Sequence, residues 1–90
     1  MKIEDLNKII NSRIKTSNKN SYTNKLLKQG PKKIAQKFGE EASELIIDFL
    51  KGSKKRTIEE AADVIYHLLV LLKSKKISMS EINKELEKRK

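Results

Sequence analysis

Apolar residues recur at three- and four-residue intervals along most of the chain, and no segment alternates between apolar and polar positions as a strand would. The first such segment covers 3–15 and predicts a helix. The polar stretch "KTSNKNS" separates it from "YTNKLLKQG", which we expect to form a short helix or a single helical turn closed by Gly30. The pattern therefore indicates an all-α chain.

Two long helices are predicted in the middle of the chain. Pro31 stands where the first residue of a helix would, and the periodic segment that it begins ends at Gly52. The next helix is predicted over about 58–75. Thr57 is expected to be its N-cap, and Glu60 then completes a capping box with Thr57. In that case Glu60 would have a purely structural role.

A short amphipathic helix is predicted at the end of the chain. In "ISMSEINKELEKRK", Ser78 and Glu81 have the spacing of a second capping box. The chain has 90 residues and no internal repeat or composition boundary. We therefore expect a single domain, 1–90, built as a bundle of four to five helices. A chain this short buries only about 60% of its unfolded surface and often gains stability by self-association.

The helix predicted over 58–75 is apolar in almost every direction around its axis. Its apolar residues are Val64, Ile65, Leu68, Leu69, Val70, Leu71 and Leu72. A helix that is apolar all round is normally surrounded by protein. One long helix and three short ones can hardly surround it, so we expect a second subunit to complete the bundle as a homodimer.

The chain is strongly basic, with 21 Lys and Arg against 12 Asp and Glu, for a net charge of +9. Such a charge favours an anionic partner. There is no cysteine, which excludes disulfides and thiolate metal sites. The charged N-terminus does not resemble a signal peptide, and no apolar run approaches the roughly 18 residues of a membrane span. We therefore expect a cytoplasmic protein that does not bind membranes.

Carboxylates gather in two places despite this basic composition. In "KFGEEASEL", Glu40, Glu41 and Glu44 share one arc of the helix, because side chains advance about 100° per residue. The arc borders the apolar face. In "EAADVIYH", Glu60 and Asp63 occupy one side of the apolar helix. Clustered carboxylates repel one another, and a divalent cation relieves that repulsion. Oxygen ligands favour Mg²⁺, with Mn²⁺ as the alternative.

Ordinary structural roles would also account for these residues. Acid pairs at this spacing often face solvent, and Lys37 has the spacing to form an i,i+4 ion pair with Glu41. His67 shares a helix side with Asp63 and is more often a hydrogen-bonded core histidine than a ligand. Tyr66 is expected in the core.

The segments "SYTNKLL", "KFGEEASE" and "EEAADVIYHLLVLL", in this order, resemble the phosphoribosyl-ATP pyrophosphohydrolase family. The acids also match the pattern EExxE followed by ExxD of the wider all-α nucleotide pyrophosphohydrolase superfamily. The resemblance implies an all-α dimer that hydrolyses 1-(5-phosphoribosyl)-ATP to the AMP compound and pyrophosphate with Mg²⁺, the second step of histidine biosynthesis. The length suits the stand-alone form of the enzyme, so we expect the next step to need a separate protein.

The resemblance and the chemistry together assign roles to individual residues. The acids that match the family's metal ligands are Glu41, Glu44, Glu60 and Asp63. A glutamate that is not fully committed to the metal would accept the proton of the attacking water, and Glu40 and Glu44 are the candidates. The predicted substrate-binding residues are Ser21, Tyr22, Thr23, Lys25 and Lys37. For Ser21, a plain helix N-cap is the alternative.

Two other functions fit parts of the sequence. A pyrophosphohydrolase that removes free or damaged nucleoside triphosphates would share the acid pattern but has no need for the "SYTNKLL" segment. A small basic helical protein that binds nucleic acid would concentrate its basic residues on one face. Lysines here are scattered through every segment, so we regard a nucleic-acid partner as the weaker interpretation.

Overall fold

The computed structural model describes residues 1–15 and 21–90, and the described chain forms helices and no strand. The helices are α1 (Ile3–Lys15), α2 (Tyr22–Lys28), α3 (Pro31–Lys51), α4 (Lys54–Ser74) and α5 (Met79–Lys88). The all-α prediction is therefore confirmed. Most of the predicted "KTSNKNS" loop, 16–20, lies outside the described residues. No helix in the described part of the chain is long and apolar enough to cross a membrane.

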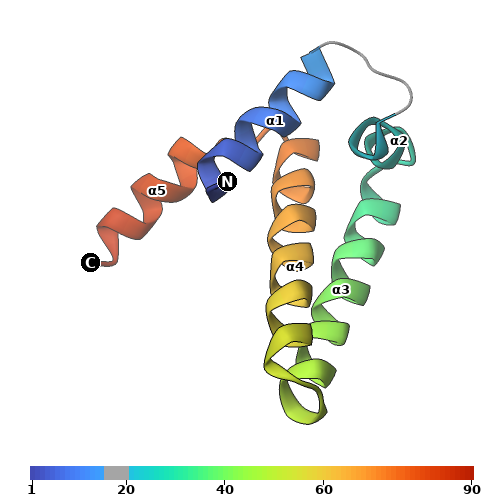
Figure 1. Ribbon diagram of the computed structural model, residues 1–90. Coiled ribbons are helices and arrows are strands. Elements are labelled where there is room, and N and C mark those ends of the chain that lie inside the picture. The colour runs from blue at the N-terminus through green and yellow to red at the C-terminus, as the bar shows by residue number, and fades with distance from the viewer. Residues whose placement is uncertain (16–20) are drawn as a thin grey trace.

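The long helices α3 and α4 form an antiparallel hairpin with the largest interhelical contact of the fold (Figure 1). At the open end of this hairpin, α2 packs near the start of α3 and α1 packs near the end of α4. Helix α5 projects away from the hairpin and leaves the C-terminus at the edge of the molecule (Figure 1). The hairpin is thus covered at one end and open along the rest of its length.

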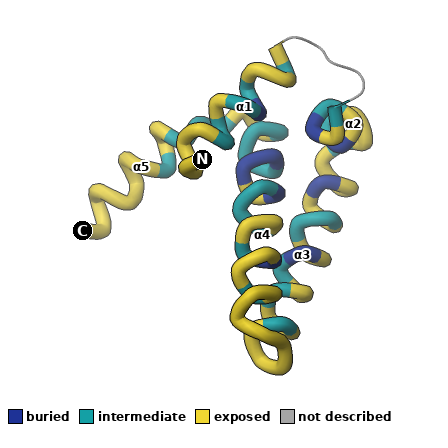
Figure 2. The backbone as a smooth tube through the Cα atoms, viewed as in Figure 1, coloured by how far each residue is buried: buried dark blue, intermediate teal, exposed yellow. Residues whose placement is uncertain are grey.

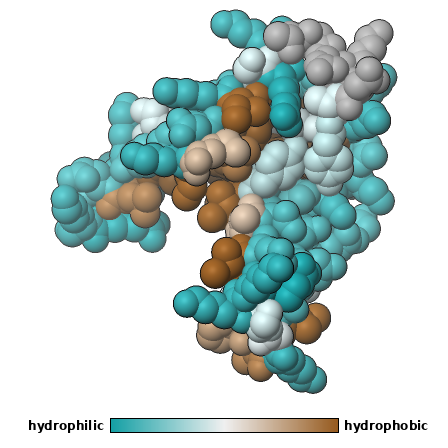
Figure 3. Space-filling model, in the orientation of Figure 1, coloured by the Kyte–Doolittle hydropathy of each residue, from teal (hydrophilic) through white to brown (hydrophobic). Residues whose placement is uncertain are grey.

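A small apolar core lies at the covered end of the hairpin, where α1 and α2 meet α3 and α4 (Figure 2). Its buried residues are Ile10, Leu26, Ile34, Leu69 and Val70. At the opposite end, apolar side chains around the α3–α4 turn remain exposed, as the brown surface in Figure 3 shows. Within one chain, therefore, α4 is only partly covered.

Most of the predicted helix boundaries are confirmed. Gly30 precedes α3 with a φ of 96°, a left-handed conformation that glycine adopts without strain, and Pro31 is the first residue of α3. Gly52 is the C-cap of α3. Ser78 and Glu81 form the predicted capping box at the start of α5. These signals are local, which explains why the sequence reports them correctly.

The predicted start of α4 is wrong. The helix begins at Lys54, and Ser53 is its N-cap, with a hydroxyl that accepts a hydrogen bond from the Arg56 N–H. Thr57 lies one turn inside the helix. Its hydroxyl lies 2.9 Å from the carbonyl oxygen of Ser53 and 3.2 Å from that of Asp48, so Thr57 sits where the first turn of α4 meets the last turn of α3. Ser53 is an equally good cap that directly follows the turn glycine. Glu60 is therefore not part of a capping box.

Candidate metal centre and phosphate-binding pocket

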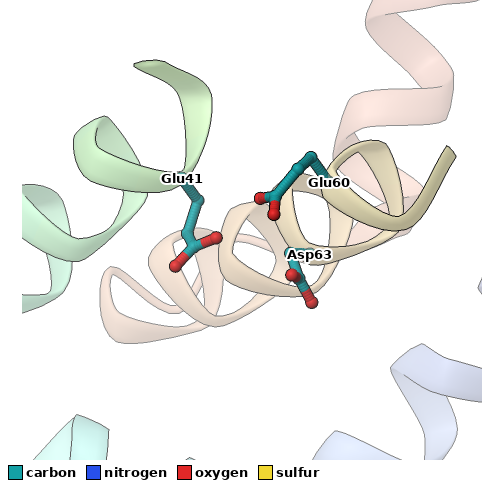
Figure 4. A group of neighbouring side chains, drawn as sticks. All are labelled: Glu41, Glu60 and Asp63. Carbon is teal, nitrogen blue, oxygen red and sulfur yellow. The ribbon is translucent and has the colours of Figure 1, made fainter. Parts of the chain in front are cut away.

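Three carboxylates converge between α3 and α4 about midway along the hairpin (Figure 4). Glu41 comes from α3, and Glu60 and Asp63 come from successive turns of α4. One oxygen from each of the three carboxylates lies within 4.8 Å of the other two. Glu41 and Glu60 are only 9% and 4% exposed, whereas Asp63 lies at the exposed edge. The result is a set of three oxygen donors with one side open to solvent.

Glu60 is the most constrained member of this cluster. Its Oε1 accepts a hydrogen bond from Arg56 at 2.5 Å, but its Oε2 is buried and has no hydrogen-bond partner among the described residues. The pKa of Glu60 is raised, first by burial and then by the charge of Glu44, while Arg56 opposes the shift. A buried carboxylate oxygen without a partner is costly. A divalent cation would satisfy this oxygen and offset the repulsion, so these residues fit a hard metal ion.

The other two acids of the EExxE pattern lie at the margins of the cluster. Glu44 is exposed and lies outside the group of three, although its charge reaches Glu60. No hydrogen bond or ion pair within the described chain engages the carboxylate of Glu44. Glu40 is also exposed and accepts a hydrogen bond from Gln36 at 3.1 Å. Glu44 thus remains beside the carboxylate cluster, whereas Glu40 belongs to the neighbouring pocket.

Lys37 lies between the acids and this pocket. Its Nζ is 3.5 Å from Glu41 Oε1 and 4.0 Å from Glu40 Oε2, so the i,i+4 ion pair with Glu41 that the spacing allows is present. The pKa of Lys37 is raised by the hydroxyl of Tyr22, when that group ionises, and by Glu41 and Glu40. The ammonium group therefore stays charged at neutral pH.

A pocket of about 360 Å³ opens beside Lys37, between α2 and the first half of α3. It is lined by Tyr22, Lys25, Leu26, Gln29, Lys33, Gln36, Lys37 and Glu40. Three ammonium groups and two amides against a single carboxylate favour an anionic ligand. Tyr22, Lys25 and Lys37 were predicted from the sequence as binding residues, whereas Lys33 and Gln36 were not. Lys33 lies one helical turn before Lys37, so helical spacing alone could have identified it.

The neighbouring residues Ser21 and Thr23 are engaged within the protein. Ser21 is the N-cap of α2, and its hydroxyl accepts a hydrogen bond from the Asn24 N–H at 3.1 Å. The N-cap interpretation of Ser21 is therefore confirmed. Thr23 is fully buried, and its hydroxyl is hydrogen-bonded to that of Tyr66. Neither residue lines the pocket described above.

Tyr22 and His67 connect the pocket to the carboxylate cluster. His67 is buried, and its Nδ1 lies 2.7 Å from the carbonyl oxygen of Asp63. Because a carbonyl only accepts, Nδ1 carries the proton, and Nε2 accepts a hydrogen bond from the Tyr22 hydroxyl at 3.2 Å. Both ring nitrogens are thus occupied, as in a hydrogen-bonded core histidine. Burial and nearby acids raise the pKa of Tyr22, which keeps its hydroxyl protonated.

Comparison with known proteins gives a consistent result. The profile of the family "Phosphoribosyl-ATP pyrophosphohydrolase" matches residues 3–90. A "Phosphoribosyl-ATP pyrophosphatase" of Sulfolobus acidocaldarius is 46% identical over 87 residues, which cover 97% of this chain and 92% of that protein. A protein of the same name from Paracoccus denitrificans is 51% identical over 69 residues, 77% of this chain and 64% of that protein. The match thus spans slightly less than two thirds of the Paracoccus relative.

A further relative is a longer protein. The "Histidine biosynthesis bifunctional protein HisIE" of Staphylococcus epidermidis is 47% identical over 88 residues. These residues cover 98% of this chain but only 42% of that protein. This chain is therefore similar to one part of the bifunctional relative.

Proposed function

Because the chain belongs to the phosphoribosyl-ATP pyrophosphohydrolase family, we propose that it hydrolyses 1-(5-phosphoribosyl)-ATP to the corresponding AMP compound and pyrophosphate in histidine biosynthesis. One structural observation supports a mechanism for this reaction. The carboxylate cluster and the lysine-lined pocket are adjacent, because Lys37 lines the pocket and also forms an ion pair with Glu41 of the cluster. A polyphosphate chain needs both a cation site and positive side chains beside the bond that breaks.

We propose that Glu41, Glu60 and Asp63 hold Mg²⁺, or Mn²⁺ in its place, and that Glu44 adds one oxygen at the edge of the site while its other oxygen stays uncoordinated. The orphaned Oε2 of Glu60 and the all-oxygen donor set support this choice. When bound, such an ion neutralises charge on the phosphates and lowers the pKa of a coordinated water. The acids would hold the positive charge of the ion at a fixed position between α3 and α4.

The lysines and Tyr22 have the complementary task of binding the substrate. Lys25, Lys33 and Lys37 would pair with phosphate oxygens, and the pocket beside them would take the nucleotide. Lys37 would exchange part of its pairing with Glu41 for a phosphate. Tyr22 holds α2 against α4 through His67 and so keeps the pocket next to the acids.

A general base is also required to take the proton of the attacking water. Glu44 is better suited than Glu40, because its exposed carboxylate lies beside the cluster and has no hydrogen bond or ion pair within the described chain. Glu40 is already paired with Gln36 and Lys37. Glu44 would accept the proton from water as the water attacks the α-phosphorus and pyrophosphate leaves.

We also propose that the enzyme works as a homodimer. Large apolar side chains cluster around the α3–α4 turn, with Phe49 72% and Leu50 71% exposed on α3, and Ile58 59% exposed on α4. Large apolar side chains exposed close together in the sequence and at one end of the hairpin are typical of a protein interface. A second copy of the hairpin would cover it and the exposed side of α4.

The deciding experiment measures pyrophosphate release from phosphoribosyl-ATP with and without Mg²⁺. We expect turnover only with the ion, and weak activity on deoxynucleoside triphosphates under the same conditions. Hydrolysis of deoxynucleoside triphosphates without any turnover of phosphoribosyl-ATP would overturn the proposed substrate. Equal turnover after complete metal removal would overturn the proposed role of the carboxylates.

A further inference from the structure

A basic residue at the first turn of α4 has a contact pattern that the proposed function does not explain. The guanidinium of Arg56 meets three different carboxylates. Its Nη1 donates to Glu59 Oε1 at 2.8 Å, and its Nη2 donates to Glu60 Oε1 at 2.5 Å. The same Nη2 lies 3.7 Å from Asp48 Oδ2 on α3. Arg56 therefore joins the two helices at the edge of the carboxylate cluster.

Only one of these three partners belongs to the carboxylate cluster. Glu60 is buried, and Arg56 occupies its Oε1 while Oε2 stays without a partner. In Figure 4 the Glu60 carboxylate is turned toward Glu41 and Asp63. A carboxylate held through one oxygen cannot rotate freely, so its second oxygen keeps a fixed direction. This is the usual relation between a metal ligand and the group that orients it.

The other two partners offset the charge of the guanidinium. A lone positive charge beside a cation site would weaken metal binding by repulsion. Glu59 and Asp48 are not members of the group of three carboxylates, and they supply two negative charges beside Arg56. Asp48 lies in the last turn of α3, where its backbone carbonyl accepts a hydrogen bond from the Gly52 N–H at 2.8 Å. The guanidinium thus contributes directed hydrogen bonds with little net repulsion.

We propose that Arg56 is a positioning residue, which holds Oε1 of Glu60 so that Oε2 is presented to the metal. The inference rests on the proposed metal-dependent function. It assigns to Arg56 neither contact with substrate nor a part in proton transfer.

The test is Mn²⁺ binding to the purified protein, followed by the electron paramagnetic resonance signal of the free ion and by calorimetry. We expect Arg56→Gln to weaken Mn²⁺ binding about tenfold, the lower end of the range for partners of metal ligands. Arg56→Lys keeps the charge but not the planar fork, so it should recover only part of that affinity. The matched control is Arg89→Gln, which removes an exposed pair with Glu85 on α5 and should leave binding unchanged.

The possible results separate this inference from the proposed function. Failure of the unaltered protein to bind Mn²⁺ would contradict the metal site itself. Normal binding by that protein, with equal or tighter binding by Arg56→Gln, would overturn the role of Arg56 alone.

If Arg56→Gln does not fold by circular dichroism, Glu59→Gln serves as the second variant. This variant leaves Arg56 in place but removes the carboxylate that accepts from its Nη1. We expect its affinity for Mn²⁺ to be several-fold lower than that of a Glu85→Gln control. Equal affinities of Glu59→Gln and its control would likewise overturn the proposal.

Discussion

The α3–α4 hairpin contains two regions with opposite composition. Midway along it, where the helices face each other, the buried residues include Glu41 and Glu60. At the turn end, the outward surface carries Phe49, Leu50 and other large apolar side chains. A stable monomer normally has the reverse arrangement. Packing within one chain therefore explains neither region, and the proposed metal ion and the proposed second subunit would each account for one of them.

The two regions differ in how far the chain itself compensates for them. In the acidic region, Lys37 and Arg56 each pair with one buried glutamate, so part of the repulsion is removed. At the turn end, no other segment of the described chain covers the apolar side chains. The charges of the acidic region are therefore partly compensated within the chain, whereas the apolar side chains at the turn end remain exposed.

The largest expected effect comes from the acidic region. We expect Asp63→Asn and Glu44→Gln each to lower pyrophosphate release by about a thousandfold, because several kcal/mol of charge stabilisation or proton transfer is lost. Helix content should be unchanged by circular dichroism. Glu87→Gln, on the exposed side of α5, is the control. A near-normal rate for either variant would remove that residue from the site.

The next effect concerns the apolar end. Phe49→Glu would place a charge in the proposed interface, and we expect the dimer to weaken by about thirtyfold or more, as at interface hot spots. Sedimentation velocity over a range of concentrations measures this. Leu86→Glu, at a residue 61% exposed on α5, is the control. A protein that is monomeric at all concentrations would contradict the dimer itself.

A smaller effect is expected at the pocket between α2 and the first half of α3. Lys33→Ala should raise the KM for phosphoribosyl-ATP about tenfold with little change in kcat, because it removes a charged contact made equally in the bound and transition states. Lys88→Ala on α5 is the control. An unchanged KM would mean that the phosphates do not reach Lys33.

The smallest effect is a pH dependence of stability. In the metal-free protein the pKa of Glu60 is raised from its ordinary value of 4.5, chiefly by burial and then by Glu44. The folded state therefore binds more protons than the unfolded state, and stability falls as pH rises through the folded pKa. Glu44→Gln should raise the melting temperature slightly at pH 8 and leave it unchanged at pH 4. A lower melting temperature at pH 8 would contradict repulsion between these acids.

The sequence predicted most helix boundaries, because caps and turns depend on neighbouring residues. Pro31, Gly52 and the Ser78–Glu81 capping box were assigned correctly. Thr57 was assigned wrongly, because Ser53 caps the helix instead, and the Thr57 hydroxyl lies inside the first turn, close to the Asp48 carbonyl of α3 as well as to that of Ser53. That contact depends on how the two helices meet, and no local pattern encodes it.

In the candidate site, too, the sequence determined some features and the tertiary structure decided others. Helical spacing by itself determined that Glu60 and Asp63 share a face and that Glu41 borders the apolar side of its own helix. Only the packing of α3 against α4 decided that Glu41, rather than Glu44, joins the pair on α4, and that Arg56 takes one oxygen of Glu60. The physical reason is that helical periodicity fixes directions around one axis. The distance between side chains on two axes depends on the crossing and depth of the packed helices.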